Sequence, residues 1–387
     1  MPDPVIVSAA RTAVGTAVKG TLANTTVEEL GTAIVAETVR RSGLDPQLFD
    51  DVILADPGTV ARYAAVENGM LTVPGQSVGR YCAGSLAAIG NAAAAIGAGM
   101  DRAIVAGGVF SASTSPRMSR RKLLTRDEWE AYSPALNPVS AQAPNFDMSI
   151  LVGHNTAQEA GISREEMDFW AWRSHMRAVA AIDAGTFAEE IVPVKVTAWD
   201  GSTVEFAVDE HPRRTTTLEK LATLKVLHPE IEGFQITAGN ASGVNDAAAA
   251  VAVTSRDLAR AEGLTQMATI RAWAAVGVHP ARTGFGALDV IRRVLGRAGR
   301  SVEDIGLWEI NEAFASVPIA ACRQLGIDEA LVNIHGSGCS IGHPISASGA
   351  RMITTLTYEL ARRGGGLGVA AMCAAAGQGG AVLIEVA

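Results

Sequence analysis

Short apolar runs alternate with segments of helical periodicity in the first third of the chain. Residues 5–9 and 52–55 are apolar runs of strand length, and residues 26–41 carry Val, Leu and Ile at helical spacing up to Gly43. A further apolar run, residues 102–105, leads to a glycine pair. This alternation predicts an α/β fold in which helices cover a sheet.

The alternation stops in the middle of the chain and then resumes. Residues 111–147 are rich in Ser, Arg, Pro and Asn, and we expect them to leave the core. Residues 163–185 show helical periodicity, and residues 268–273 and 307–310 are again apolar runs of strand length. The pattern therefore predicts a sheet core that is interrupted once by a long excursion.

Composition and charge narrow the class of protein. The 387 residues are 48% hydrophobic and 19% charged, which indicates one large or two ordinary compact domains. The net charge of -8 argues against nonspecific nucleic-acid binding, and no apolar run predicts a membrane span. The first residues carry no leader pattern, so we expect a cytoplasmic protein whose partner is a small molecule.

Cysteine usage points to a reactive thiol. The spacing of the four cysteines fits neither a disulfide framework nor a zinc site, so we expect free thiols and no metal. Cys82 is the leading nucleophile, because it stands where a strand passes into an alanine-rich helix. The N–H groups of a helix N-terminus would lower its pKa from about 8.5 toward roughly 7. The alternative interpretation is a small buried hydrophobic residue.

Three stretches in the last third carry further candidate chemistry. Residues 309–315 bring Asn311 to the end of a strand, although Asn is also a good helix cap. Residues 333–351 are dense in glycine and hold His343 between a glycine and a proline. Residues 367–386 form two apolar strands interrupted by Cys373 and a turn of small residues. A weak internal repeat links the Cys82 helix to this region and predicts two similar halves that face each other.

A basic cluster stands out in an otherwise acidic chain. It is either a solvent-exposed basic segment or a binding site for a phosphate group of the ligand. It consists of Arg117, Arg120, Arg121 and Lys122.

The chain resembles the thiolases along its whole length. The resemblance implies a five-layered αβαβα fold of two duplicated halves and a homodimer or homotetramer. It also implies that residues 1–110 and 246–265 form the N-terminal half, residues 111–245 an inserted loop domain and residues 266–387 the C-terminal half. The matching motifs are VIVSAARTAVG at 5–15, the Cys82 helix, RTTTLEKL at 214–221, TAGNASG at 237–243, NEAFA at 311–315, GHP at 342–344 and CAAAGQG at 373–379.

The resemblance also implies an activity with acyl-CoA and CoA as partners. The expected reaction is thiolysis of a 3-oxoacyl-CoA, or the reverse condensation, through an acyl group on Cys82. His343 would assist Cys82, and Cys373 would move the α-proton of acetyl-CoA. His343 and a water held by Asn311 would bind the enolate oxygen.

The same resemblance implies the remaining contacts of the site. Backbone N–H groups of Cys82 and Ala375 would form a second oxyanion hole. Ser242 matches a serine that contacts CoA, and Arg213 is a candidate for its nucleotide end. CoA would be a substrate, and neither a cofactor nor a metal is implied.

Several positions depart from the common thiolase pattern. They suggest a substrate other than acetoacetyl-CoA, and a Cβ at Ala375 would strain the N–H meant for the oxyanion. The departures are the run Ala374, Ala375 and Ala376, the order of Gly84 and Ser85, Phe110 after the glycine pair, His154 and Asn155 in the loop domain, and His335, Ser337 and Cys339 before GHP.

Two other readings of the sequence stay open. A ketoacyl-synthase-type condensing enzyme shares the fold and the nucleophilic cysteine, but it would carry a histidine or asparagine where this chain has Cys373. A catalytically silent, thiolase-like scaffold is favoured by the three alanines and opposed by the complete set of reactive residues. The sequence chooses neither the direction of the reaction nor the acyl chain length.

Overall fold

The computed structural model describes residues 2–387, in which one continuous sheet runs through two halves of the chain. Strand order along the sheet is β13-β14-β15-β12-β1-β11-β5-β3-β4. The first half contributes β1 (Pro4–Thr12), β2 (Gly15–Thr16), β3 (Asp51–Ala55), β4 (Gly75–Ser77), β5 (Ala103–Phe110) and β11 (Asn245–Ser255). The second half contributes β12 (Ala268–Gly277), β13 (Leu307–Ile310), β14 (Gly366–Ala374) and β15 (Gln378–Val386).

The two halves of the sheet meet at a short junction. β1 pairs with β12 through only two residue pairs, Val5 with Thr269 and Ile6 with Ala268. On either side of that junction the pairing is long: β1 runs antiparallel to β11, and β12 runs antiparallel to β15. The sheet therefore consists of two extensively paired halves that are joined by the short pairing of β1 with β12.

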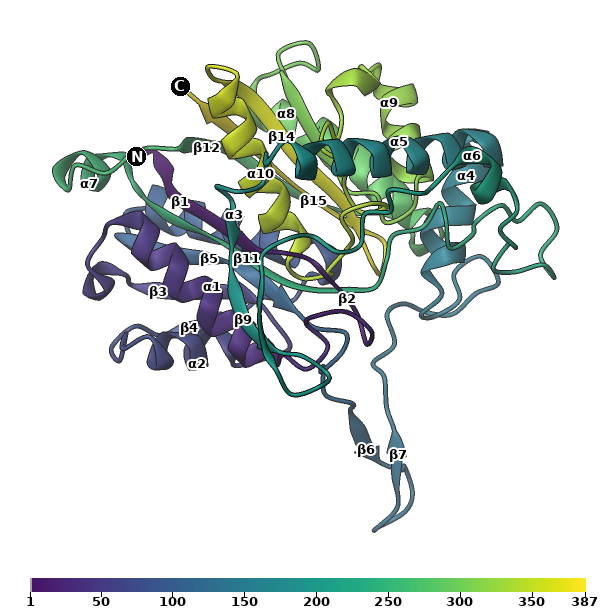
Figure 1. Ribbon diagram of the computed structural model, residues 1–387, viewed down its shortest axis with the longest axis horizontal. Helices are drawn as coiled ribbons and strands as arrows, with labels where there is room; N and C mark the ends of the chain where they lie inside the picture. The colour runs from purple at the N-terminus through teal and green to yellow at the C-terminus, as the bar shows by residue number, and fades with distance from the viewer. Residues whose placement is uncertain (1) are drawn as a thin grey trace.

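Helices lie outside both halves and also between them. Helices α1 (Val27–Ser42) and α2 (Val60–Glu67) pack on the outer face of the first half. Helices α8 (Gly286–Ala298) and α9 (Ser316–Leu325) belong to the core on the outer face of the second half. Helices α3 (Gly84–Gly97) and α10 (Ser348–Arg362) contact strands of both halves (Figure 1). The order of layers is therefore helix, sheet, helix, sheet, helix.

Strand periodicity explains why the sequences of these strands are continuously apolar. Val5 and Val7 on β1 join the core under α1, whereas Ile6 between them joins the central core with α3 and α10. Successive side chains of a strand point to opposite faces, so both faces of this sheet require apolar residues. A strand buried on both sides cannot show polar alternation.

Local side chains set the ends of two helices, and the predicted end of the first helix before Gly43 is confirmed. Thr26 caps α1 and forms a capping box with Glu29, and Gly43 ends the helix at a φ of 73°. Ser163 and Glu166 form the same capping box at α5 (Arg164–Asp183). These caps satisfy the free N–H groups of the first helical turn.

The excursion begins after β5 and ends before β11. It includes a hairpin arm of β6 (Ser119–Arg121) and β7 (Trp129–Ala131), which projects from the body in Figure 1. The remaining elements are α4 (Asn155–Ala160), α5, β8 (Ile191–Val192), β9 (Val194–Thr197), β10 (Thr203–Phe206) and α6 (Leu218–Ala222), and α7 (Arg256–Ala261) follows β11.

Within residues 2–387, no helix has the length and apolar character needed to cross a membrane.

Candidate active site

A cavity of about 250 Å³ lies where the central helices begin. Cys82 precedes α3 and His343 precedes α10, so the two central helices direct their N-termini to one place. Five of the residues to which the sequence analysis gave a role in the reaction or in substrate binding line this cavity: Cys82, Ser242, His343, Cys373 and Ala375.

Most of the remaining cavity wall is apolar. These side chains exclude water, which strengthens polar interactions inside the cavity. The wall includes Phe110, Met148, Val152, Val244, Phe314 and Ile345.

Cys82 sits on a single 3-10 turn, Tyr81–Ala83, directly before α3. Tyr81 has a φ of 44°, which marks a tight, left-handed entry into this turn. Close packing also requires glycine opposite the turn, because a Cβ on Gly380 would lie 2.7 Å from the Cβ of Ala83. The strand β15 therefore packs closely against the turn that carries Cys82.

The thiol of Cys82 differs from the sequence expectation. Burial raises its pKa to about 11, while the backbone N–H groups of Ala375 and Cys82 act in the opposite direction. The predicted lowering toward 7 is therefore wrong for the resting protein, because loss of solvation outweighs the N–H groups. The same two N–H groups are those expected to form an oxyanion hole, and both act on the Cys82 thiol by lowering its pKa.

Cys373 lies near the end of β14 and pairs with Gly379 on β15. Burial raises the pKa of its thiol well above the ordinary range, and the neighbouring Cys82 raises it further. Both thiols are therefore protonated at neutral pH, and they lie within electrostatic reach of each other.

Strain in the alanine turn falls one residue later than expected. Ala376, and not Ala375, adopts a left-handed φ of 65°, and Gly377 follows at 69°. A Cβ destabilises this conformation, which glycine adopts freely. The N–H of Ala375 therefore reaches Cys82 without a left-handed backbone at its own position.

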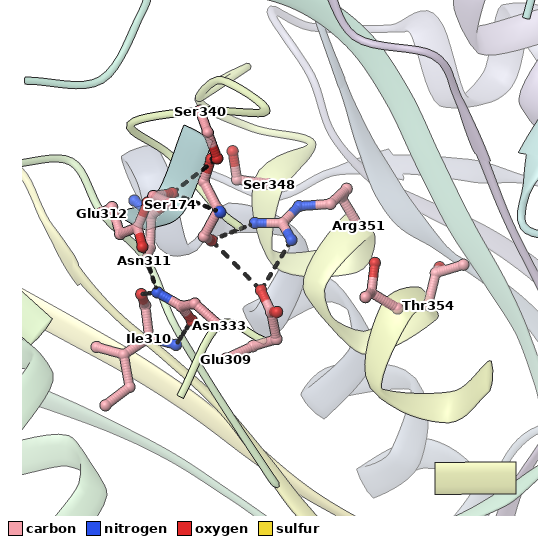
Figure 2. Close-up of polar contacts among 12 residues, drawn as sticks. Ser174, Glu309, Ile310, Asn311, Glu312, Asn333, Ser340, Ser348, Arg351 and Thr354 are labelled. Atoms are coloured by element: carbon pink, nitrogen blue, oxygen red, sulfur yellow. Dashed lines mark hydrogen bonds and ion pairs between the residues drawn. The ribbon is translucent and has the colours of Figure 1, made fainter. Parts of the chain in front are cut away.

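His343 is held by hydrogen bonds on its backbone and on its ring. Its N–H donates to Asn245 Oδ1 at 3.0 Å, and its Nδ1 lies 2.7 Å from Ser348 Oγ. Burial lowers the pKa of His343 to about 4, and the guanidinium of Arg351 lowers it as well. Arg351 itself forms a buried ion pair with Glu309 at 2.8 Å (Figure 2). His343 is therefore a neutral imidazole at pH 7, the form that accepts a proton.

Asn311 lies against the ring of His343. Its Nδ2 is 3.4 Å from both ring nitrogens, a position over the ring face and not in line with either nitrogen lone pair. Its backbone N–H donates to Ala371 O at 3.0 Å, which aligns this residue with β14. Asn311 is fully buried, and its Oδ1 has no hydrogen-bond partner among residues 2–387.

Ser242 reaches the cavity through backbone pairing between two motifs. Its N–H donates to Ala313 O at 3.0 Å, and the N–H of Ala315 donates to Asn240 O at 2.9 Å. The TAGNASG and NEAFA motifs therefore form adjacent walls of one site.

Arg213 and the basic cluster lie elsewhere. Arg213 is exposed and is not among the cavity-lining residues, and its expected contact with the nucleotide end of CoA stays a prediction. Arg120 and Lys122 lie on or beside the hairpin arm, where they pair with Glu130 and Glu128 at 2.8 and 2.9 Å. The interpretation as a solvent-exposed basic segment fits them better than a phosphate site at the cavity.

The departures from the common motif occupy different surroundings. Phe110, the last residue of β5, lines the cavity. His154 stacks on Phe234 with ring centroids 4.8 Å apart, and Asn155 donates to two backbone oxygens. His335 pairs with Glu359 at 3.0 Å. Of these four, only Phe110 touches the cavity.

Sequence reasoning missed three residues that hold the site. Ser348 contacts His343 Nδ1, Asn245 accepts from the His343 backbone, and Glu312 binds the elements around Asn311. Ser348 and Glu312 lie within stretches that the sequence did single out, but their contacts join residues far apart in the chain. The only local feature that indicated Ser348 is that a helix begins there, five residues after His343.

Comparisons with known proteins cover nearly the whole chain. Residues 4–257 match the family described as thiolase, N-terminal domain, and residues 264–386 match thiolase, C-terminal domain. The chain is 39% identical to an acetyl-CoA acetyltransferase of Pseudomonas aeruginosa, over 99% of both chains. It is also 39% identical to a 3-ketoacyl-CoA thiolase of Bacillus subtilis, over 100% of both chains.

Solved structures agree with these matches. The acetyl-CoA acetyltransferase of Bacillus anthracis has a TM-score of 0.89 at 35% identity, with 100% of this chain and 99% of that chain covered. Human mitochondrial 3-ketoacyl-CoA thiolase also has a TM-score of 0.89, at 30% identity and the same coverage. The predicted α/β fold of two halves is thereby confirmed, and the chain belongs to the thiolase family.

Proposed function

We propose that this protein is a thiolase that cleaves a 3-oxoacyl-CoA with CoA, or runs the reverse condensation, through an acyl-Cys82 intermediate. The observation that carries the proposal is the meeting of Cys82, His343 and Cys373 in one cavity, with the N–H of Ala375 at the Cys82 sulfur. Relatives named acetyl-CoA acetyltransferase and 3-ketoacyl-CoA thiolase support it. None of those relatives carries a ketoacyl-synthase name.

In the first half of thiolysis, Cys82 attacks the 3-oxo carbonyl carbon. Neutral His343 accepts the thiol proton, which is necessary because burial keeps Cys82 protonated. The N–H groups of Cys82 and Ala375 bind the oxyanion that forms. The C2–C3 bond then breaks and leaves the acyl group on sulfur and an enolate of acetyl-CoA.

Cys373 and Asn311 act on the enolate of acetyl-CoA in this proposal. Protonated His343 and a water held by Asn311 bind the enolate oxygen, and Cys373 gives its proton to the enolate carbon to release acetyl-CoA. The raised pKa of Cys373 favours this role because the thiol enters the step protonated.

The second half transfers the acyl group to CoA. The CoA thiol loses its proton to the thiolate of Cys373 and attacks the acyl-Cys82 carbonyl. Cys82 leaves as a thiolate and regains its proton from His343. CoA acts as a substrate throughout, and the steps use no metal or bound cofactor.

Ser242 is proposed to contact the CoA portion of the substrate at the cavity mouth, since it is half-buried there. A homodimer or homotetramer in the cytoplasm also stays a prediction.

The proposal is tested by intact-protein mass after incubation with a series of acyl-CoAs. Wild type should gain one acyl group that is removed by free CoA, and Cys82→Ser should gain none on that time scale. The acyl chain that loads fastest identifies the substrate length. Absence of any adduct on wild type with every acyl-CoA would contradict the proposal.

A further inference from the structure

Glu312 carries a buried carboxylate that accepts four hydrogen bonds from neutral donors. Its side chain is 1% exposed, and it forms no ion pair with any of residues 2–387. Its Oε1 accepts from Trp170 Nε1 at 2.9 Å and Asn333 Nδ2 at 2.8 Å. Its Oε2 accepts from Ser174 Oγ at 2.7 Å and the N–H of Cys339 at 3.0 Å.

These donors belong to two segments, α5 and the glycine-rich stretch of residues 333–351, which meet at Glu312. Trp170 and Ser174 lie on α5, in the excursion between β5 and β11. Asn333 also exchanges two hydrogen bonds of 2.8 Å with the backbone of Ile310, at the end of β13 (Figure 2). Cys339 lies in the glycine-rich loop, four residues before His343. Glu312 itself follows Asn311 directly.

The four donors match the acceptor sites of a carboxylate. Each oxygen faces two donors, and a carboxylate accepts at about four lone-pair sites. An amide in its place would turn its NH2 group toward at least one N–H donor, either that of Cys339 or those of Trp170 and Asn333. Removal of the side chain would leave buried donors unpaired, and unpaired buried groups are strongly destabilising. Glutamine is therefore not a conservative replacement here.

We propose that Glu312 is a positioning residue that fixes Asn311 to α5 and so sets the position of the Asn311 amide over the His343 ring. Asn311 lies over the His343 ring, so a rotation at residue 312 moves the amide relative to the ring. A displacement of about 1 Å at reacting groups costs on the order of 100-fold in rate. The inference rests on the proposed function, in which Asn311 acts on the enolate whereas Cys82 takes up the acyl group.

The main test compares Glu312→Gln with Asp209→Asn. Asp209 is another buried carboxylate, bonded to Arg11 at 2.7 Å, and it does not line the cavity. Each variant is assayed for loading of Cys82 from an acyl-CoA and for full thiolysis at saturating substrate. We expect Glu312→Gln to lose about 100-fold more kcat than Asp209→Asn, with KM within a few-fold and with loading retained.

A second variant keeps the test decisive if Glu312→Gln fails to fold. The double variant Trp170→Phe with Ser174→Ala removes one donor from each carboxylate oxygen and cuts the link to α5 alone. It should lower kcat by about tenfold and leave loading unchanged. Equal kcat in this variant and wild type, or equal loss in Glu312→Gln and Asp209→Asn, would overturn the positioning role. Failure of wild type to load Cys82 would instead count against the proposed function.

Discussion

The Nδ1 atom of His343 lies 2.7 Å from the hydroxyl oxygen of Ser348, and that hydroxyl also lies 3.0 Å from the carbonyl oxygen of Pro344. A hydroxyl has one hydrogen, and the Pro344 carbonyl can only accept it. Both contacts are satisfied when Ser348 donates to Pro344 and His343 donates from Nδ1. This network assigns the proton to Nδ1 and leaves the Nε2 lone pair free to act as a base.

Replacement of Ser348 by alanine should slow the acylation of Cys82 by about tenfold. The loss of one hydrogen bond of about 1.4 kcal/mol releases the ring and its tautomer. Single-turnover acylation followed by mass spectrometry measures this rate. Ser346→Ala is the matched control, because Ser346 precedes it by two residues and its side chain has no hydrogen bond within residues 2–387. Equal rates in the two variants would refute the tautomer assignment.

Alkylation of Cys82 should report a raised thiol pKa. Because burial raises the pKa of Cys82 to about 11, the thiolate fraction keeps growing above pH 8.5, where an ordinary exposed cysteine levels off. Iodoacetamide kinetics from pH 7 to 10, read by peptide mass and compared with glutathione, check this. A rate that is already maximal at pH 7 would mean that the N–H groups outweigh burial.

Cys373→Ser should separate the two halves of the reaction. Serine keeps the volume of the side chain but is a far weaker acid and base than a thiol. The variant should still accept an acyl group on Cys82, and its condensation rate should fall by about 100-fold or more. Cys322→Ser is the matched control, since Cys322 is buried in α9 away from the cavity. Normal condensation by Cys373→Ser would remove Cys373 from the mechanism.

Two glycine substitutions in one turn should have opposite effects on stability. Ala376→Gly relieves the left-handed φ of 65° and should raise the free energy of unfolding by about 1 kcal/mol. Ala375→Gly has no such strain to relieve and should lower it by about 0.5 kcal/mol through added chain entropy. Urea unfolding of both variants measures the difference. Equal effects at the two positions would contradict the conformation of the turn.

The free energy of unfolding should decrease as the pH drops below 6.5, and His175 should account for part of this decrease. Burial lowers its pKa to about 3, and His211 and Arg213 act in the same direction. In the unfolded chain His175 binds a proton near pH 6.5, whereas in the folded chain it stays neutral down to about pH 3. Protonation therefore favours the unfolded state, and the free energy of unfolding decreases as the pH falls from 6.5 toward 3. His175→Gln should reduce the stability lost between pH 6 and pH 5 by about 1 kcal/mol. Urea unfolding at the two pH values checks this, and identical losses in both proteins would exclude the contribution.

Much of the fold and the reactive residues could be predicted from local patterns. Apolar runs such as residues 5–9 and 52–55 became β1 and β3, and Gly43 ended α1 as its position indicated. Cys82, His343 and Cys373 stood out because small residues and a proline surround them, and all three line one cavity. The strands, the helix end and the surroundings of these three residues depend on residues that are adjacent in the chain, and the sequence shows adjacent residues directly.

The sequence alone therefore determined the alternation of strands and helices, the family resemblance and the residues that could react. The tertiary structure alone decided which side chains meet them. It raised the pKa of Cys82, brought Ser348 to His343 and Glu312 to α5, and left Arg213 outside the cavity. Solvation and hydrogen bonding depend on atoms brought together from distant parts of the chain, and they exist only once the two halves have packed around α3 and α10.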